Sequence, residues 1–236
     1  MRTRSFPSRI QPSTSPARTS TGVDLLVVGI TGASGSIYGI RLLEVLRTTT
    51  EIELHLIVSA AGKRTLLEET DYSVADVEAL AHHRYDVKDV GAALASGSFR
   101  TGGMVIAPCS IKTAAAIAAC YADTLIARAA DVTLKERRPL VLMVRETPLH
   151  LGHLENMTLL TRMGAIIFPP VPAFYHRPKT LDDVINQTVT RNLDQFGIDV
   201  NLFERWSDEG MSRHPEADFA SAPSGREREQ EIKKSR

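Results

Sequence analysis

The chain has 236 residues, which corresponds to one large domain or to one domain with tails. Apolar residues make up 43% and charged residues 24%, as in ordinary globular proteins. Basic and acidic residues number 28 each, so the net charge is zero and binding of nucleic acid through charge is not expected. No apolar run approaches the roughly 18 residues of a membrane span. The two cysteines, Cys109 and Cys120, fit a reducing compartment such as the cytoplasm rather than a secreted disulfide framework.

The two ends differ in composition from the middle. Residues 1–22 are rich in Ser, Thr, Pro and Arg and contain no acidic residue, and residues 207–236 mix charges with Ser, Ala and Pro. We expect a disordered N-terminal extension over 1–22, a folded domain over 23–206 and a disordered C-terminal tail over 207–236. Residues 1–22 also fit a mitochondrial transit peptide, which would place the protein in the matrix.

In the middle, short apolar runs alternate with segments of helical periodicity. We predict strands over 25–30, 54–58, 104–107, 140–144 and 165–168. We predict helices over 36–47, 60–69, 111–119, 124–136 and 154–163, a short helix after the capping box at Ser73, and a last helix after the capping box at Thr180. The apolar stripe of the last helix comprises Leu181, Val184, Ile185, Thr188, Leu193 and Phe196. This alternation indicates an α/β fold with a parallel sheet, in which ligands bind beyond the carboxyl ends of the strands.

Two of the loops that follow predicted strands are suited to binding an anion. Residues 31–36 read TGASGS and residues 108–113 read PCSIKT, and each segment opens a predicted helix. Glycines permit close approach of the backbone, and helix N-termini offer free N–H groups. Neither segment matches GxGxxG or the Walker pattern, and either one alone is as well explained by a structural turn. If both turns converge, they indicate a nucleotide-type cofactor.

The later loops carry residues that could handle charge. Arg145 and Glu146 directly follow a predicted strand, where an anion and a proton could be held. The pair His150 and His153 has no third ligand at metal spacing, so packing or backbone hydrogen bonding is the favoured interpretation and no metal is expected. Residues 169–178 form a stiff, aromatic loop that is either a surface connector or an apolar lid carrying the Tyr175 hydroxyl.

Six segments together resemble the UbiX/Pad family of flavin prenyltransferases. They read TGASGS, ASGSF at 95–99, APCSIKT, LKERRPL, VRETPLHLGHLENM and PPVPAFYHRP, and the likeness spans about residues 24–206. The sequences of these segments are similar to those of family members that accompany phenolic-acid decarboxylases. The resemblance implies a flavodoxin- or Rossmann-like three-layer sandwich and a homododecamer with sites at subunit interfaces. It also implies that dimethylallyl phosphate is joined to N5 and C6 of reduced FMN, giving prenylated FMN for a UbiD-type decarboxylase.

The resemblance assigns roles to individual positions. The FMN-binding positions are Gly32, Ala33, Ser34, Ser59, Ser110, Ile111, Lys112, Thr113 and Arg145. Those that hold the prenyl phosphate are Lys135, Tyr175 and Arg191. The catalytic positions are Ser34, Glu69, Lys135 and Glu146, with Ser34 and Glu69 paired near flavin N5 and Glu146 as the acid/base. Arg128 and Trp206 match positions near the site. Taken without the resemblance, Lys135 lies in a run of charged residues that is typical of a solvated helix end. The chain has no Asp-rich diphosphate-binding motif, so Mg²⁺ is not implied.

Two alternative functions remain open at this point. A flavin-dependent cysteine decarboxylase would need an Asn-bearing turn and an early His base, whereas this chain has PCSIKT and only His55, inside a predicted strand. A non-catalytic, flavin-carrying subunit of a decarboxylase would not need the set formed by Lys135, Glu146, Tyr175 and Arg191. The chain is also short over 85–99, where the family often carries a longer segment, so the wall of the prenyl pocket is not defined.

Overall fold

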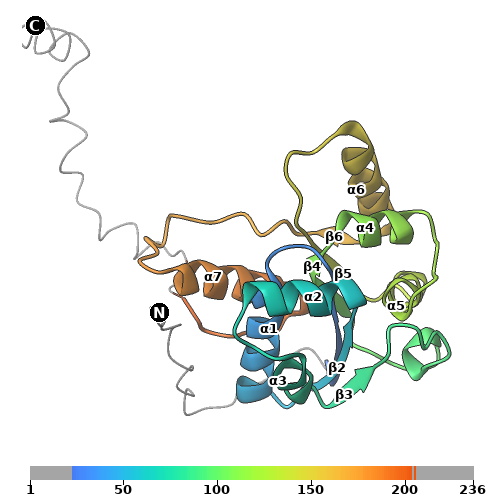
Figure 1. Ribbon diagram of the computed structural model, residues 1–236, viewed down its shortest axis with the longest axis horizontal. Helices are drawn as coiled ribbons and strands as arrows, with labels where there is room; N and C mark the ends of the chain where they lie inside the picture. Colours follow the sequence, from blue (N-terminus) through green and yellow to red (C-terminus); the bar gives the residue numbers. More distant parts are fainter. Residues whose placement is uncertain (1–22, 204, 206–236) are drawn as a thin grey trace, which may run out of the picture. The chain divides into compact units, whose positions relative to one another are not determined.

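The computed structural model describes residues 23–203 and residue 205 (Figure 1). The expected tails over 1–22 and 207–236, and Trp206, lie outside the described residues. Six parallel strands form one sheet in the order β3-β2-β1-β4-β5-β6. Their bounds are β1 Leu25–Ile30, β2 Glu53–Val58, β3 His83–Tyr85, β4 Met104–Cys109, β5 Leu140–Val144 and β6 Ile166–Ile167. The order reverses between β1 and β4, and this switch point is where doubly wound sheets bind ligands.

Helices cover both faces of the sheet and make three layers, as predicted. One face carries α1 Ser36–Thr49, α2 Ala60–Glu69, α3 Val74–Ala79, α7 Leu181–Leu193 and the 3₁₀ turn η2 Asp194–Phe196. The other carries α4 Ile111–Ala118, α5 Leu125–Lys135, α6 Leu151–Met163 and the 3₁₀ turn η1 Ala93–Ala95 (Figure 1). Alternate residues of β1 enter the two cores, which explains its uninterrupted apolar run. No helix in the described ranges has the length and apolarity to cross a bilayer.

The structure differs from the sequence-based expectation in a few elements. The prediction missed β3, because its three residues His83, Arg84 and Tyr85 form no apolar run and lie at the sheet edge. Helix α6 starts at Leu151, earlier than predicted, because the His150 side chain accepts a hydrogen bond from the Gly152 N–H and caps the helix. The predicted stripe of α7 was wrong at Leu181, which is 71% exposed because it lies in the first turn, beyond the core contacts.

Strand β4 also runs further than predicted. It passes Pro108 and ends at Cys109, with an irregularity in its pairing to β5 between Ile106 and Cys109. A proline has no N–H to give to the ladder, so the irregularity accommodates it within an otherwise central strand. The two capping boxes predicted at Ser73 and Thr180 are both present.

Candidate functional site

The turns after β1 and β4 are joined by the buried side chain of Thr31. Its hydroxyl donates a hydrogen bond to the Pro108 carbonyl oxygen at 2.8 Å and accepts one from the Ser110 N–H at 2.8 Å. The Thr31 N–H also donates to the Pro108 carbonyl oxygen, at 3.2 Å. These bonds fix the two turns against each other at the switch point of the sheet. The expected convergence of the two loops is therefore confirmed.

Close packing explains the glycines of the first turn. A Cβ atom on Gly32 would lie 2.5 Å from the Cβ of Ala61 in α2, so a larger residue does not fit without movement. Gly35 has a φ of 101°, in the left-handed region that glycine tolerates best, and it precedes α1 without a side-chain cap. Between them, Ala33 is buried and Ser34 is partly exposed. The turn therefore packs its backbone directly against α2.

Glu69, at the end of α2, takes over the capping of α1. Its Oε2 accepts hydrogen bonds from the N–H groups of Gly35 at 2.8 Å and Ser36 at 3.1 Å. Burial opposes ionisation of Glu69, but hydrogen bonds from the Ser34 hydroxyl and from these two N–H groups outweigh it and lower the pKa of the carboxyl. The structure thus brings together Ser34 and Glu69, the pair that the sequence resemblance places near the flavin.

The serines expected to contact FMN also cap helices. The Ser59 hydroxyl accepts a hydrogen bond from the Gly62 N–H at 2.9 Å and begins α2. The Ser110 hydroxyl accepts one from the Thr113 N–H at 3.3 Å and lies 3.1 Å from the Thr113 hydroxyl. At the same N-terminus of α4, Ile111 is partly exposed and Lys112 is exposed. A helix N-terminus flanked by two hydroxyls and a lysine is suited to a phosphate group.

The cysteine in this turn is not a nucleophile. Cys109 is fully buried at the end of β4, and this burial raises the pKa of its thiol to about 12. A thiol with so high a pKa stays protonated near neutral pH. The chemistry of the site therefore rests on hydroxyls, cations and carboxylates.

The loop after β5 adjoins the same edge of the sheet. The Arg145 N–H donates to the Cys109 carbonyl oxygen at 3.2 Å, and the side chains of Arg145 and Glu146 are exposed. The Glu146 carboxylate accepts a hydrogen bond from the Thr147 N–H at 3.0 Å. The rings of His150 and His153 lie 3.5 Å apart, and His150 caps α6. Backbone hydrogen bonding, the favoured interpretation for the histidine pair, is thus present at His150.

Lys135 lies at the opposite, amino-terminal edge of the sheet. It ends α5, shortly before β5 begins, and it forms an ion pair with Glu136. A Cβ atom added to Gly97, within the ASGSF segment, would lie 2.5 Å from the Lys135 Nζ. The five residues of β5 rise about 16 Å from one edge to the other. Within one chain, Lys135 is therefore not brought to Arg145 and Glu146.

Two arginines near Lys135 donate hydrogen bonds to backbone carbonyl oxygens. Arg138 donates to the carbonyl oxygens of Phe99 and Gly97, both at 2.8 Å, and so fixes the ASGSF segment against the end of α5. Arg128 donates to the Ala95 carbonyl oxygen at 3.2 Å and pairs with Asp131 at 2.7 Å. The short segment before β4 is thus anchored to α5 by arginines.

Tyr175 contacts α7, the helix that carries Arg191. The Tyr175 hydroxyl accepts a hydrogen bond from Gln187 Nε2 at 3.3 Å, and Arg191 lies one helical turn further along the same face. Arg191 pairs with Asp194 at 2.6 Å and about half of its side chain is exposed. Thus two of the three residues expected to hold the prenyl phosphate are placed by the same helix, although they come from different segments.

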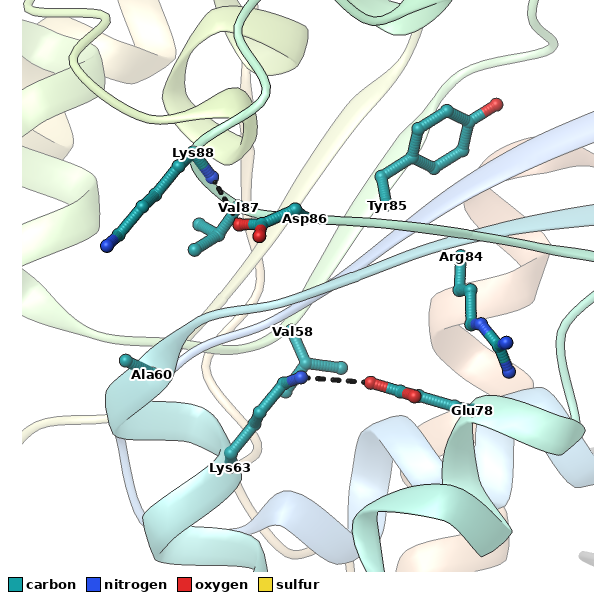
Figure 2. A pocket seen from close by; sticks show the side chains of 9 residues that line it. All are labelled: Val58, Ala60, Lys63, Glu78, Arg84, Tyr85, Asp86, Val87 and Lys88. Carbon is teal, nitrogen blue, oxygen red and sulfur yellow. Dashed lines mark hydrogen bonds and ion pairs between the residues drawn. The ribbon is translucent and has the colours of Figure 1, made fainter.

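A pocket in the described part of the chain lies elsewhere, beside the carboxyl ends of β2 and β3. An ion pair between Lys63 and Glu78, 3.0 Å long, crosses it (Figure 2). Its lining consists of Val58, Ala60, Lys63, Glu78, Arg84, Tyr85, Asp86, Val87 and Lys88. None of these is a predicted site residue. Most of the predicted site residues are exposed or partly exposed, whereas Ala33 is buried.

Comparison with known proteins agrees with this geometry. Residues 13–192 match the Flavoprotein family. The flavin prenyltransferase UbiX of Escherichia coli K12 is 63% identical over 183 residues, which cover 77% of this chain and 97% of that protein. A crystal structure of AnUbiX in complex with FMN and dimethylallyl pyrophosphate has a TM-score of 0.77 at 49% identity, covering 78% of this chain and 98% of the other. A dodecameric FMN-dependent UbiX-like decarboxylase from Escherichia coli O157:H7 has a TM-score of 0.76 at 51% identity, with 78% and 99% covered. From its fold, its convergent turns and these relatives, the chain belongs to the UbiX flavin prenyltransferases of the Flavoprotein family.

Proposed function

We propose that this flavin prenyltransferase joins dimethylallyl phosphate to reduced FMN, first at N5 and then at C6, and that a UbiD-type decarboxylase uses the product. The observation that carries the proposal is the Thr31 bridge, which holds two anion-binding turns together at the switch point of the sheet. The FMN and dimethylallyl pyrophosphate bound to AnUbiX support FMN as the acceptor and dimethylallyl as the group transferred.

The turns around Thr31 would hold FMN. The N-terminus of α4, with the hydroxyls of Ser110 and Thr113, would bind its phosphate. The turn from Gly32 to Ser34 would lie against the ring system. Gly32 lets the backbone of this turn pack directly against α2. Reduced FMN supplies the nucleophilic atoms. The Ser34–Glu69 pair, a hydroxyl and an ionised carboxylate in hydrogen-bonding contact, would lie near the ring.

The cationic residues would hold the prenyl donor. Breaking the allylic C–O bond develops negative charge on the phosphate, and Lys135, Arg191 and the Tyr175 hydroxyl would stabilise it. Lys135 and Arg191 now pair with Glu136 and Asp194, so phosphate binding replaces one anionic partner by another. Glu146 would accept the proton that C6 loses when its ring becomes aromatic again.

We propose that a second copy of the chain completes the site. Lys135 and Glu146 lie at opposite edges of the sheet in one chain, yet both are needed near one allyl phosphate. If Lys135 of one subunit lies beside Glu146 of a neighbouring subunit, both residues can act on the same allyl phosphate. The dodecameric form of the UbiX-like relative supports a homododecamer. For the compartment we propose the cytoplasm, or the mitochondrial matrix if residues 1–22 act as a transit peptide.

One anaerobic assay tests the activity directly. The purified protein is mixed with reduced FMN and dimethylallyl phosphate, and the flavin product is weighed by mass spectrometry; parallel reactions contain the diphosphate. We expect a flavin heavier by one prenyl group, and a second bond that leaves its mass unchanged but alters its absorption. Glu146→Gln should accumulate the single-bond product. A protein that binds FMN but never changes its mass would be a flavin-carrying subunit and would contradict the proposal.

A further inference from the structure

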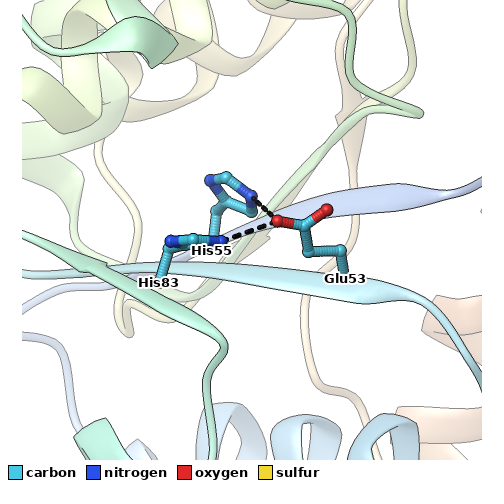
Figure 3. Close-up of side chains that lie close together, drawn as sticks. All are labelled: Glu53, His55 and His83. Carbon is cyan, nitrogen blue, oxygen red and sulfur yellow. Dashed lines mark hydrogen bonds and ion pairs between the residues drawn. The ribbon is translucent and has the colours of Figure 1, made fainter.

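Three potential metal ligands converge on the β2–β3 edge of the sheet, away from the flavin turns. His55 in β2 and His83 in β3 are direct register partners, and Glu53 lies two residues before His55 on the same face of the strand. The Glu53 Oε1 lies 3.2 Å from His55 Nε2 and 2.7 Å from His83 Nε2 (Figure 3). The ligand atoms of the three residues all lie within 4.8 Å of one another.

These distances suit a tetrahedral metal ion. Bonds of about 2.0–2.1 Å to a tetrahedral Zn²⁺ place neighbouring ligand atoms roughly 3.4 Å apart. The distances from Glu53 Oε1 to the two histidine nitrogens, 3.2 and 2.7 Å, reach this value with small side-chain movements. Two imidazoles and one carboxylate form a donor set typical of zinc and similar divalent transition ions, with a fourth position left for water. We propose that Glu53, His55 and His83 bind a divalent transition-metal ion, with Zn²⁺ as the best match. None of these residues belongs to the proposed prenyltransferase site.

Tyr85 is placed to orient the buried ligand. Its hydroxyl lies 2.8 Å from His55 Nδ1, and His55 is only 2% exposed. Binding a metal through Nε2 requires the proton of His55 to reside on Nδ1, and a hydroxyl can accept a hydrogen bond from that N–H. Without a metal, both imidazoles can donate from Nε2 to Glu53 while the Tyr85 hydroxyl donates to Nδ1. Tyr85 therefore accommodates the tautomer of His55 in either state.

The site is open to solvent and would support a weak part of the sheet. The side chains of Glu53 and His83 are each about half exposed, so an ion can reach the buried His55 from the edge. Strand β3 has three residues and pairs only through them with β2. The Phe99 ring lies 5.6 Å from the His55 ring, so the ASGSF segment packs against the same cluster. A bound ion would join β3 to β2 and strengthen this edge.

The neighbouring histidine, His82, is not a member of the cluster. Its Nδ1 accepts a hydrogen bond from the Leu54 N–H at 2.9 Å, and its Nε2 contacts Arg47. Both ring nitrogens are thus engaged on the other side of the strand. This leaves three protein ligands and predicts that one ion binds per chain.

Metal titration of the full-length protein tests the inference. After removal of metals with a chelator, ZnCl₂ binding is measured by calorimetry and Co²⁺ binding by its visible absorption, which is intense for tetrahedral sites. We expect one site per chain, at least tenfold weaker in His83→Gln and Glu53→Gln, with loss of the Co²⁺ bands. Glu51→Gln, a matched change at an exposed neighbouring glutamate, should bind as wild type. Tyr85→Phe should bind about tenfold more weakly, as for other residues that orient a ligand.

Two further readouts keep the inference open to contradiction. Zn²⁺ should raise the melting temperature of the wild type but not of His83→Gln. Should the variants fail to fold, anomalous diffraction at the zinc edge from wild-type crystals decides, with a peak expected among the three side chains. An absent site in the wild type, unchanged affinity in His83→Gln, or a peak at His150 and His153 instead would overturn the inference. None of these readouts depends on prenyl transfer, so the two proposals can fail separately.

Discussion

The two edges of the sheet hold their functional residues in different ways. At the carboxyl edge, bonds between distant segments fix the turns, as where Thr31 bridges to Pro108 and Ser110. At the amino-terminal edge and on α7, the cations Lys135 and Arg191 pair with acids one and three residues away. The first edge is therefore rigid before any ligand binds, whereas the cations at the second can exchange their partners. This contrast suits a flavin held in a fixed place and a phosphate that arrives and leaves.

Complementation between subunits gives the largest effect that this comparison predicts. Lys135→Ala and Glu146→Gln should each be nearly inactive alone. When the two variants are unfolded, mixed and reassembled, about one quarter of sites formed at random between copies contain both native residues. We expect prenyl transfer to recover accordingly, measured by single-turnover formation of the flavin adduct. If the mixture stays as inactive as its parts, Lys135 and Glu146 do not act together across an interface.

Arg191→Ala tests the exchangeable cations. We expect prenyl transfer to fall about 100-fold, because a charge-assisted donor to the leaving phosphate is lost, while FMN affinity changes little. Arg64→Ala removes an exposed arginine paired with Glu68 and should leave the rate unchanged. Rates are compared at saturating reduced FMN over a range of dimethylallyl phosphate concentrations. Equal rates throughout, or a variant that cannot hold FMN, would reject the assigned role.

Thr31→Val tests the rigid edge. The change removes the side-chain partner of the Ser110 N–H and one of the two hydrogen bonds that the Pro108 carbonyl accepts from Thr31, which should cost about 2 kcal/mol of unfolding free energy and weaken FMN binding about tenfold. Thr158→Val, which removes an exposed hydroxyl bonded only within α6, should change stability by less than about 0.5 kcal/mol. Urea unfolding and flavin fluorescence titration measure the two effects. Similar losses of unfolding free energy and FMN affinity in both variants would show that the Thr31 bridge does not stabilise the site.

Glu69→Gln gives the smallest effect, and the size of that effect depends on pH. The folded-state pKa of Glu69 lies below the ordinary value of 4.5, so its stabilisation is present above that value and lost as pH falls through the folded-state pKa. Because the side chain is exposed, we expect less than about 1 kcal/mol at pH 7. Urea unfolding at neutral and acidic pH should show wild type and variant converging as the pH falls. A difference that grows on acidification would contradict the assignment.

Local patterns predicted much of the fold because they depend on neighbours in sequence. The capping boxes at Ser73 and Thr180 were recognised from spacing alone, and both are present. Strand β3 could not be recognised, because a short polar edge strand has no pattern apart from its partner. The glycine-rich turn after β1 was visible, but the long-range bonds of Thr31 were not, since they join residues far apart in the chain. The Glu53–His55–His83 cluster was missed for the same reason: only the register of β2 against β3 makes it.

The sequence by itself determined the α/β class, the order of most strands and helices, and membership of the flavin prenyltransferases, because buried runs, helical periodicity and motif wording are local properties. Only the tertiary structure decided which of the motif residues lie together. It put the Ser34–Glu69 pair, the Ser110 turn and Arg145 at one edge of the sheet and Lys135 at the other. The physical reason is the direction of the chain: a residue that ends a helix and one that follows the next strand lie at opposite ends of that strand, however close they are in sequence.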